Sequence, residues 1–282
     1  MNKYRDEIGF INLDIIDKKD VNHMTSFRKI NFIYNDEKYY YKRCKGIINC
    51  YYELIAYEIS HQMNLESCNY DLATYVDEIG VVSKNFLKEN DEIIRLETLL
   101  NEIYQDEELS KYNNLKDIEN ALNIKFGNDI TNNLMDQLIK IFIFDVVIGN
   151  IDRHMDNIFL VKNNDIKISP IFDNEKMLSN ESIEMGIYSL GIDREDYKFS
   201  KDEYEYSDNF IYKFLEEYSE YKDMLINNLN IIEEDNLDII FNNVENKINN
   251  KIEENIKKYI KSKFKQNKNM IENVLSNKTK KL

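Results

Sequence analysis

A polar nonapeptide, Gly149-Asn-Ile-Asp-Arg-His-Met-Asp-Asn157, directly follows a strongly apolar stretch of the chain. In the preceding segment 129–148, Ile130, Leu134 and Leu138 fall on one helical face, and the segment becomes apolar on nearly all sides toward its end. This pattern predicts a buried helix. Because a loop at the end of a buried helix is held in place, it is a favoured location for reactive side chains.

The residues after the nonapeptide predict a small β-hairpin that leads to a second acidic position. Two short apolar strands, about 157–161 and 166–169, flank a polar turn, and Ser-Pro-Ile-Phe-Asp173 follows. Phosphoryl transfer uses an Asp to orient the acceptor hydroxyl, and Asn and Asp oxygens to hold Mg²⁺ on the nucleotide phosphates. Asp152, Asn157 and Asp173 supply this set. The alternative is a polar turn in which Asn157 only caps a strand.

The first 90 residues or so predict a small sheet with one helix. Alternating β-formers over residues 28–43 indicate a hairpin, residues 52–63 have helical spacing of apolar positions, and 70–76 and 79–83 are short strand candidates. We therefore expect an N-terminal lobe over residues 1–88.

The remainder, residues 89–282, is predicted to be a larger and mostly helical lobe. Helical segments are expected at about 92–105, 115–123 and 129–148, and again over most of the chain after the hairpin. The final helix is expected to carry an apolar seam with a spacing of four, made by Ile248, Ile252, Ile256, Ile260 and Phe264.

Charge and cysteine content exclude some classes of protein. The formal charge of −15 disfavours nonspecific binding to nucleic acid or anionic membrane. Residues 247–282 carry eleven Lys against three Glu, a pattern that predicts a solvated helix face rather than a nucleic-acid site. Three cysteines without CxxC spacing indicate neither a zinc site nor a disulfide framework, and no long apolar segment occurs. We expect a cytoplasmic protein without a membrane span.

Asp152-Arg-His-Met-Asp-Asn157 and Pro170-Ile-Phe-Asp173 together resemble the catalytic region of HipA-like serine/threonine protein kinases, whose fold is distantly related to phosphatidylinositol 3/4-kinases. The resemblance implies an α+β, bilobal, protein-kinase-like fold, with ATP and Mg²⁺ as cofactors. It implies that Asp152 is the catalytic Asp, that His154 orders the loop or contacts phosphate, and that Asn157 and Asp173 hold Mg²⁺. The sequence Ile-Phe-Asp-Asn in place of Asp-Phe-Gly sets the chain apart from ordinary eukaryotic-type protein kinases.

The resemblance extends to the N-terminal lobe, where a strand Lys binds the nucleotide phosphates and pairs with a helix Glu. Lys42 ends the second strand of the predicted hairpin, and Glu53 stands at the start of the next helix. Lys45 is the rival for the first role, and Glu58 is the rival for the second. The sequence thus favours a pair formed by Lys42 and Glu53.

Two further segments are implied to contact ATP. The passage Val81–Leu87, which includes Lys84, Asn85 and Phe86, is expected to meet the adenine edge through its backbone while Phe86 or Leu87 covers its face.

The loop Met24–Lys29 precedes the first strand of the hairpin, and Ser26 is the candidate for contacting phosphate and for autophosphorylation, supported by Arg28 and Lys29. The glycine that the family places beside this serine is missing, so an ordinary turn role for Ser26 stays open.

These observations leave three functions to compare. The first is Mg²⁺- and ATP-dependent phosphorylation of Ser or Thr on a protein substrate, including the chain itself. The second is a phosphoinositide-type lipid kinase, which the acidic charge and the lack of a membrane anchor disfavour. The third is a nucleotide-binding pseudokinase or a toxin that an antitoxin-like partner restrains. The presence of Lys42, Asp152, Asn157 and Asp173 favours an enzyme.

Overall fold

The chain is described by a computed structural model. The described residues are 1–7, 9–23, 29–105, 115–150, 152–153, 155–178, 197–200, 203–206, 214–215 and 217–278. Two of the predicted site residues, Ser26 and His154, lie outside them.

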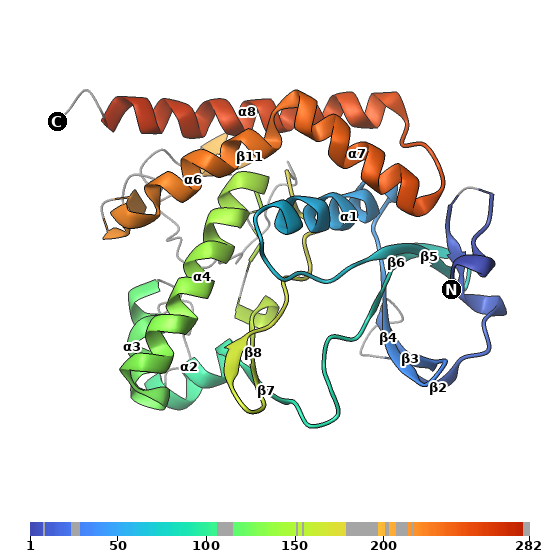
Figure 1. Cartoon of the computed structure of the whole chain (residues 1–282), viewed down its shortest axis with the longest axis horizontal. Coiled ribbons are helices and arrows are strands. Elements are labelled where there is room, and N and C mark those ends of the chain that lie inside the picture. The colour runs from blue at the N-terminus through green and yellow to red at the C-terminus, as the bar shows by residue number, and fades with distance from the viewer. Residues whose placement is uncertain are drawn as a thin grey trace.

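The N-terminal part contains a six-stranded sheet in the order β1-β5-β6-β4-β3-β2 (Figure 1). Neighbouring strands run antiparallel except β1 and β5, which run parallel. The predicted hairpin is β3 and β4, and the two short strand candidates are β5 and β6. The strands span Ile11–Asn12 (β1), Lys19–His23 (β2), Lys29–Tyr34 (β3), Glu37–Arg43 (β4), Asp71–Tyr75 (β5) and Glu78–Lys84 (β6).

Local turn chemistry sets the register of the hairpin that carries Lys42. Asn35 and Asp36 form its two-residue turn with φ of 50° and 59°, the left-handed conformation that type I′ turns require and that Asn and Asp tolerate. The turn pairs Lys29 with Lys42 across the two strands. Both lysines therefore stand at the same end of the hairpin.

Helix α1, Ile47–Gln62, packs against this sheet through a buried face that includes Leu54, Ile55 and Ile59. On β6, Gly80 permits a close approach to β4, since a Cβ atom there would overlap the Lys42 carbonyl oxygen and lie 2.6 Å from the Tyr41 ring. The strand that presents Lys42 is thus packed closely on its β6 side.

The rest of the chain forms a mostly helical region (Figure 1). It contains a three-stranded sheet in the order β7-β8-β9 and a two-stranded sheet of β10 and β11. Helix α4, which is buried along its second half, supplies the predicted apolar stretch. The elements span Glu92–Arg95 (β7), Leu96–Tyr104 (α2), Leu115–Phe126 (α3), Asn128–Ile148 (α4), Phe159–Lys162 (β8), Ile166–Ile168 (β9), Tyr197–Ser200 (β10), Glu203–Tyr206 (β11), Lys222–Asn228 (α6), Glu234–Ile248 (α7) and Glu254–Lys278 (α8).

Three predicted helices differ from the structure. The helix predicted over 52–63 begins earlier, at Ile47, so that Glu53 lies in its second turn. The segment 92–105 begins as strand β7, because its first residues pair with β8, and only from Leu96 is it helical. The predicted seam of the last helix belongs to two helices. Asn249, in the left-handed conformation, ends α7 directly after Ile248, as is common at helix C-termini, while Ile252 is buried in the connection before α8.

Helix α7 packs against α1, so the C-terminal part of the chain covers the helix of the N-terminal sheet (Figure 1). The buried cluster that contains α1 side chains also contains residues of α4, α7 and α8. We propose residue 88, in the connection between β6 and β7, as the boundary between the two lobes.

Cys44 and Cys50 form a disulfide, with their Cα atoms 5.7 Å apart, whereas the sequence indicated no disulfide. The bond joins the end of β4 to the first turn of α1. The spacing of six residues carries no recognisable motif, and only the turn between strand and helix brings the two thiols together. The third cysteine, Cys68, is free and buried.

We expect the unreduced protein to be about 2 Da lighter by intact mass spectrometry than the reduced protein, and reduction to lower the free energy of unfolding by about 2 kcal/mol. Cys68→Ser is the matched control, because it should retain the mass difference. Alkylation of all three thiols without prior reduction would contradict the pairing.

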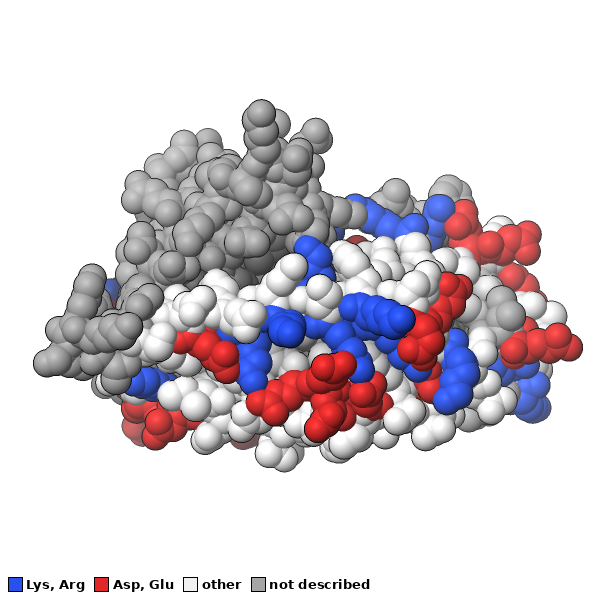
Figure 2. All heavy atoms as spheres, turned by 90° about the horizontal axis from the view of Figure 1, so that it is seen from above, with Lys and Arg blue, Asp and Glu red and all other residues white. Residues whose placement is uncertain are grey.

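Lysines of α8 form ion pairs with acidic residues in α7 and directly before it. Lys261 lies 2.8 Å from Asp238, and Lys268 lies 2.6 Å from Glu233. On the face seen in Figure 2, basic and acidic side chains stand side by side. Among the described residues, no helix is both long and apolar enough to cross a membrane.

Candidate active site

The polar nonapeptide begins where α4 ends. Gly149 takes the left-handed conformation at φ 61° and terminates the helix. Asn150 then donates its side-chain amide to Asp145 Oδ1 at 2.9 Å, and its own side-chain oxygen accepts the Asp152 N–H at 3.2 Å. Since Asn150 and Asp145 are both buried, the backbone at Asp152 is held directly on the end of a core helix.

Arg153 joins this loop to the segment around Asp173. Its guanidinium is 1% exposed and bonds both carboxylate oxygens of Asp145 at 3.0 Å. It also donates to the Phe172 carbonyl and, at 2.6 Å, to Asn174 Oδ1. The sequence pattern assigns no role to Arg153. The one available signal is Asp145, a charged residue inside an apolar helical run, which requires a buried partner but does not identify it.

Lys42 is 4% exposed and is surrounded by carboxylates. Its ammonium is 3.0 Å from Glu53 Oε1 and 3.1 Å from Glu175 Oε2, and it also donates to Asp173 Oδ1. Burial would lower the pKa of Lys42, but Glu53, Asp173 and Glu175 together raise this pKa well above its ordinary value. Lys42 is therefore charged at neutral pH.

Glu53 connects α1 to the same segment. Its Oε2 accepts the Asn174 backbone N–H at 2.8 Å, while its Oε1 accepts from Lys42. The rivals stand elsewhere: Lys45 is exposed, and Glu58 bonds Asn243 at 2.9 Å. The structure thus brings the predicted pair, Lys42 and Glu53, to the predicted metal-binding turn.

Asp173 stands at the centre of these contacts with a left-handed backbone, φ 61°, a conformation that Asp tolerates better than most residues. Burial opposes its ionisation, but Lys42 and Lys29 outweigh burial and lower its pKa to about 2. Lys29 Nζ lies 3.8 Å from Asp173 Oδ2. The carboxylate is therefore ionised and able to hold a cation at neutral pH.

Asp173 should contribute to stability above the unfolded carboxyl pKa of 3.8, and this contribution should disappear as the pH falls toward 2. The difference in the free energy of unfolding between wild type and Asp173→Asn, measured in urea, should therefore be largest near pH 7 and shrink by about 1–2 kcal/mol between pH 5 and pH 2. A difference that does not depend on pH would show that Asp173 is not ionised in this network.

The oxygen donors that Mg²⁺ prefers are present in this region. Asn157, at the end of the short 3₁₀ helix Met155–Asn157, is 7% exposed and donates its amide N–H to the Asp152 carbonyl at 3.2 Å. Among the described residues, no group of three or more His, Cys, Asp and Glu could hold a metal. Asn157 and the ionised Asp173 nonetheless fit a kinase-type site, because phosphates and water supply the other ligands of its metal.

The structure does not bring every predicted ATP-binding residue to this region. Lys84 is exposed and pairs with Glu37 at 2.8 Å. The Asn85 N–H donates to the Lys38 carbonyl at 2.8 Å, and the Leu87 N–H donates to Asn85 Oδ1 at 3.0 Å. These two N–H groups are therefore already bonded, one to strand β4 and one within the linker, the connection between β6 and β7.

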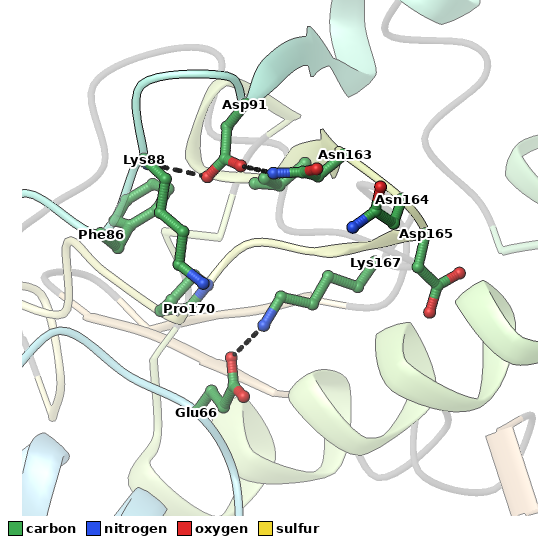
Figure 3. A pocket seen from close by; sticks show the side chains of 10 residues that line it. Glu66, Phe86, Lys88, Asp91, Asn163, Asn164, Asp165, Lys167 and Pro170 are labelled. Carbon is green, nitrogen blue, oxygen red and sulfur yellow. Dashed lines mark hydrogen bonds and ion pairs between the residues drawn. The ribbon is translucent and has the colours of Figure 1, made fainter.

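Phe86 stacks on Phe172, the residue before Asp173, with ring centroids 6.3 Å apart, and Phe172 contacts Phe159 at 5.1 Å. An aromatic cluster thus connects the linker, strand β8 and the turn that carries Asp173. Phe86 also lines a cavity of about 320 Å³ between the linker and the β8–β9 hairpin (Figure 3). Lys42 and Asp173 do not line this cavity, whose wall includes Glu66, Lys88, Asp91, Asn163, Lys167 and Pro170.

A small sheet with one helix, a mostly helical second region, and a buried Lys–Glu pair at an Asp-containing turn make up an α+β, kinase-like fold. No protein-family model matches the chain. The serine/threonine-protein kinase CtkA of Helicobacter pylori is 28% identical over 162 residues, which is 51% of this chain and 48% of that protein. The chain is thus related to a kinase, and it matches about half the length of this curated relative.

Solved structures agree on the fold. A crystal structure described as the proinflammatory kinase CtkA of Helicobacter pylori aligns with a TM-score of 0.58 at 19% identity, over 95% of this chain and 98% of that one. HipA of Shewanella oneidensis, in a complex with HipB and operator DNA, aligns with a TM-score of 0.51 at 13% identity, over 94% of this chain and 67% of that one. The predicted α+β kinase-like fold is confirmed.

Proposed function

We propose that the chain is a Mg²⁺- and ATP-dependent kinase that transfers the γ-phosphate to Ser or Thr of a protein substrate. The observation that carries the proposal is the joint engagement of Lys42 by Glu53 and Asp173. Phosphoryl transfer relies on positioning and charge neutralisation rather than on covalent chemistry of the protein. A charged lysine fixed beside an ionised metal-binding carboxylate meets both requirements.

Each residue has a distinct task in the proposed reaction. When bound, Mg²⁺-ATP supplies the phosphoryl group and neutralises charge on the phosphates. Lys42 donates hydrogen bonds to phosphate oxygens, and Glu53 orients Lys42. Asn157 and Asp173 hold Mg²⁺. Asp152 orients the acceptor hydroxyl and accepts its proton as the hydroxyl oxygen bonds to phosphorus and the bond to the β-phosphate oxygen breaks.

Arg153 contributes indirectly to the proposed mechanism. Its contacts to Phe172 and Asn174 flank Asp173, and its own position follows Asp152. This supports a fixed relation between the loop that handles the acceptor and the turn that handles the metal. Displacements of about 1 Å in such a site reduce rates strongly.

The test is incubation of the purified chain with ATP and Mg²⁺, followed by mass spectrometry of the chain itself. We expect a gain of one phosphate per modified residue, with Ser26 as the predicted position. Ser26→Ala should remove that phosphopeptide, while the distant Ser276→Ala should leave it unchanged. ATP turnover that requires liposomes would favour a lipid acceptor, and binding of ATP without any transfer would favour a pseudokinase.

A protein partner is part of the proposal. The Shewanella HipA structure contains HipB and operator DNA, and the shared fold supports an antitoxin-like partner for this chain. Co-expression with a candidate antitoxin, followed by size-exclusion chromatography, tests for a stable complex. The −15 charge supports binding through the partner protein rather than to nucleic acid directly.

A further inference from the structure

The Lys42 ammonium contacts one more carboxylate than the Lys–Glu pair and the metal-binding Asp require. Glu175 Oε2 lies 3.1 Å from Lys42 Nζ, and the Glu175 side chain is 18% exposed. This Oε2 is buried and, within the described part of the chain, accepts no hydrogen bond of normal geometry. Its charge is therefore compensated through the ion pair with Lys42.

Glu175 is held in this position by the backbone on which it stands. Its carbonyl oxygen accepts the side-chain N–H of Asn49, in the first turn of α1, at 3.0 Å. The preceding residue, Asn174, is bonded to both Glu53 and Arg153. Because the backbone of Glu175 and that of the residue before it are both hydrogen-bonded, the Glu175 side chain stays near Lys42. An ordinary surface carboxylate could instead rotate into solvent.

The charges around Lys42 do not balance. Three carboxylates, those of Glu53, Asp173 and Glu175, contact a single ammonium, and Lys29 lies 3.8 Å from Asp173 with its side chain 41% exposed. A nucleotide triphosphate brings further negative charge to the same ammonium. In a partly buried site, repulsion between like charges is only weakly screened by solvent.

We propose that Glu175 is a positioning residue that competes with nucleotide phosphates for Lys42, so that nucleotide binds to this chain only together with a divalent cation. The inference rests on the proposed function. With metal present, the cation compensates Asp173 and the phosphates, and the ammonium can leave Glu175 for a phosphate oxygen. Without metal, phosphates meet uncompensated carboxylates and Lys42 stays with Glu175.

The test compares the affinity for ATP of wild type and Glu175→Gln, measured by titration calorimetry in EDTA and in excess Mg²⁺. Gln keeps the size of the side chain and the backbone bond to Asn49. We expect wild type to bind ATP only with Mg²⁺, and Glu175→Gln to bind ATP in EDTA at least about tenfold more tightly than wild type. Glu92→Gln is the matched control, because Glu92 is an exposed acid that pairs with Lys162.

The failures of the two proposals are distinguishable. If wild type bound ATP neither in EDTA nor in Mg²⁺, the proposed function would be wrong. If wild type bound ATP with Mg²⁺ but Glu175→Gln gave the same affinity in EDTA as wild type, the role of Glu175 would be wrong. Weaker binding of Mg²⁺-ATP by Glu175→Gln, without a gain in EDTA, would also overturn it and indicate a metal ligand.

A second variant guards against misfolding. Asn49→Ala removes the bond that fixes the Glu175 backbone and leaves the carboxylate itself intact but less firmly held beside Lys42. It should therefore raise the affinity for ATP in EDTA as Glu175→Gln does, but by less. Thermal unfolding of each apo variant provides the check on folding. A loss of stability in both variants with no change in affinity in EDTA would overturn the proposal.

Discussion

Replacing Asp152 by Asn should reduce the rate of phosphate transfer by roughly 10²–10⁴-fold, the usual contribution of a general base. The change keeps the size of the side chain and the backbone N–H that bonds Asn150, so the loop should keep its position. The affinity for Mg²⁺-ATP should change little, because the proposed nucleotide and metal contacts come from other residues. The measurement is the initial rate of phosphate incorporation at saturating ATP.

Asp156→Asn is the matched control for this prediction. Asp156 stands in the same loop, four residues after Asp152, and is exposed. Its substitution should leave the rate within about twofold, as expected for a surface change. Equal losses in both variants would mean that the effect comes from the charge of the loop. An Asp152→Asn protein with the wild-type rate would remove Asp152 from the catalytic role.

Replacing Arg153 by Met should lower the free energy of unfolding by about 3–5 kcal/mol, because it leaves the buried carboxylate of Asp145 without its charged partner. The pair is almost completely enclosed, with side-chain exposures of 1% and 3%. Removing the exposed pairing of Arg43 with Glu78 by Arg43→Met should cost less than about 1 kcal/mol. Urea unfolding of the two variants side by side gives the comparison.

The double variant Asp145→Leu with Arg153→Met separates charge from position. Since no unpaired charge is then buried, much of the lost stability should return. Activity should not return, because the contacts of Arg153 to Phe172 and Asn174 are still missing. Recovery of both properties would show that Arg153 serves stability alone and does not position the turn that carries Asp173.

Most of the secondary-structure elements could be predicted from short-range sequence patterns. The hairpin of β3 and β4 could be predicted because alternation and a turn of Asn and Asp are local signals, and α4 could be predicted from its continuous apolar run. Helix α2 was placed too early, since β7 exists only through its pairing with β8, which follows more than 60 residues later. Apolar spacing likewise could not reveal the break between α7 and α8.

The candidate site, like the fold, could be predicted only in part. Asp152, Asn157 and Asp173 could be selected from residue type and spacing. Lys42 and Glu53 were selected from their predicted places at the end of a strand and at the start of a helix, although α1 begins earlier, at Ile47. The role of Arg153 could not be predicted, because an arginine in a polar loop has the same sequence signature whether it is exposed or buried. Lys84 was selected for its place at the end of β6, but strand alternation puts it on the opposite face of the sheet from Lys42, where it pairs with Glu37.

The sequence by itself determined which residue types stand at which spacing: an acidic loop after a buried helix, a hairpin, a second Asp, and a Lys and a Glu in a β-rich first lobe. Only the tertiary structure decided which of them meet. Lys42 and Asp173 are separated by 131 positions and are joined by one hydrogen bond, and Glu175 enters the same group through a turn whose backbone is fixed by Asn49 and Glu53. Such contacts depend on how packed elements cross, and this is settled by burial of the whole core rather than by any local pattern.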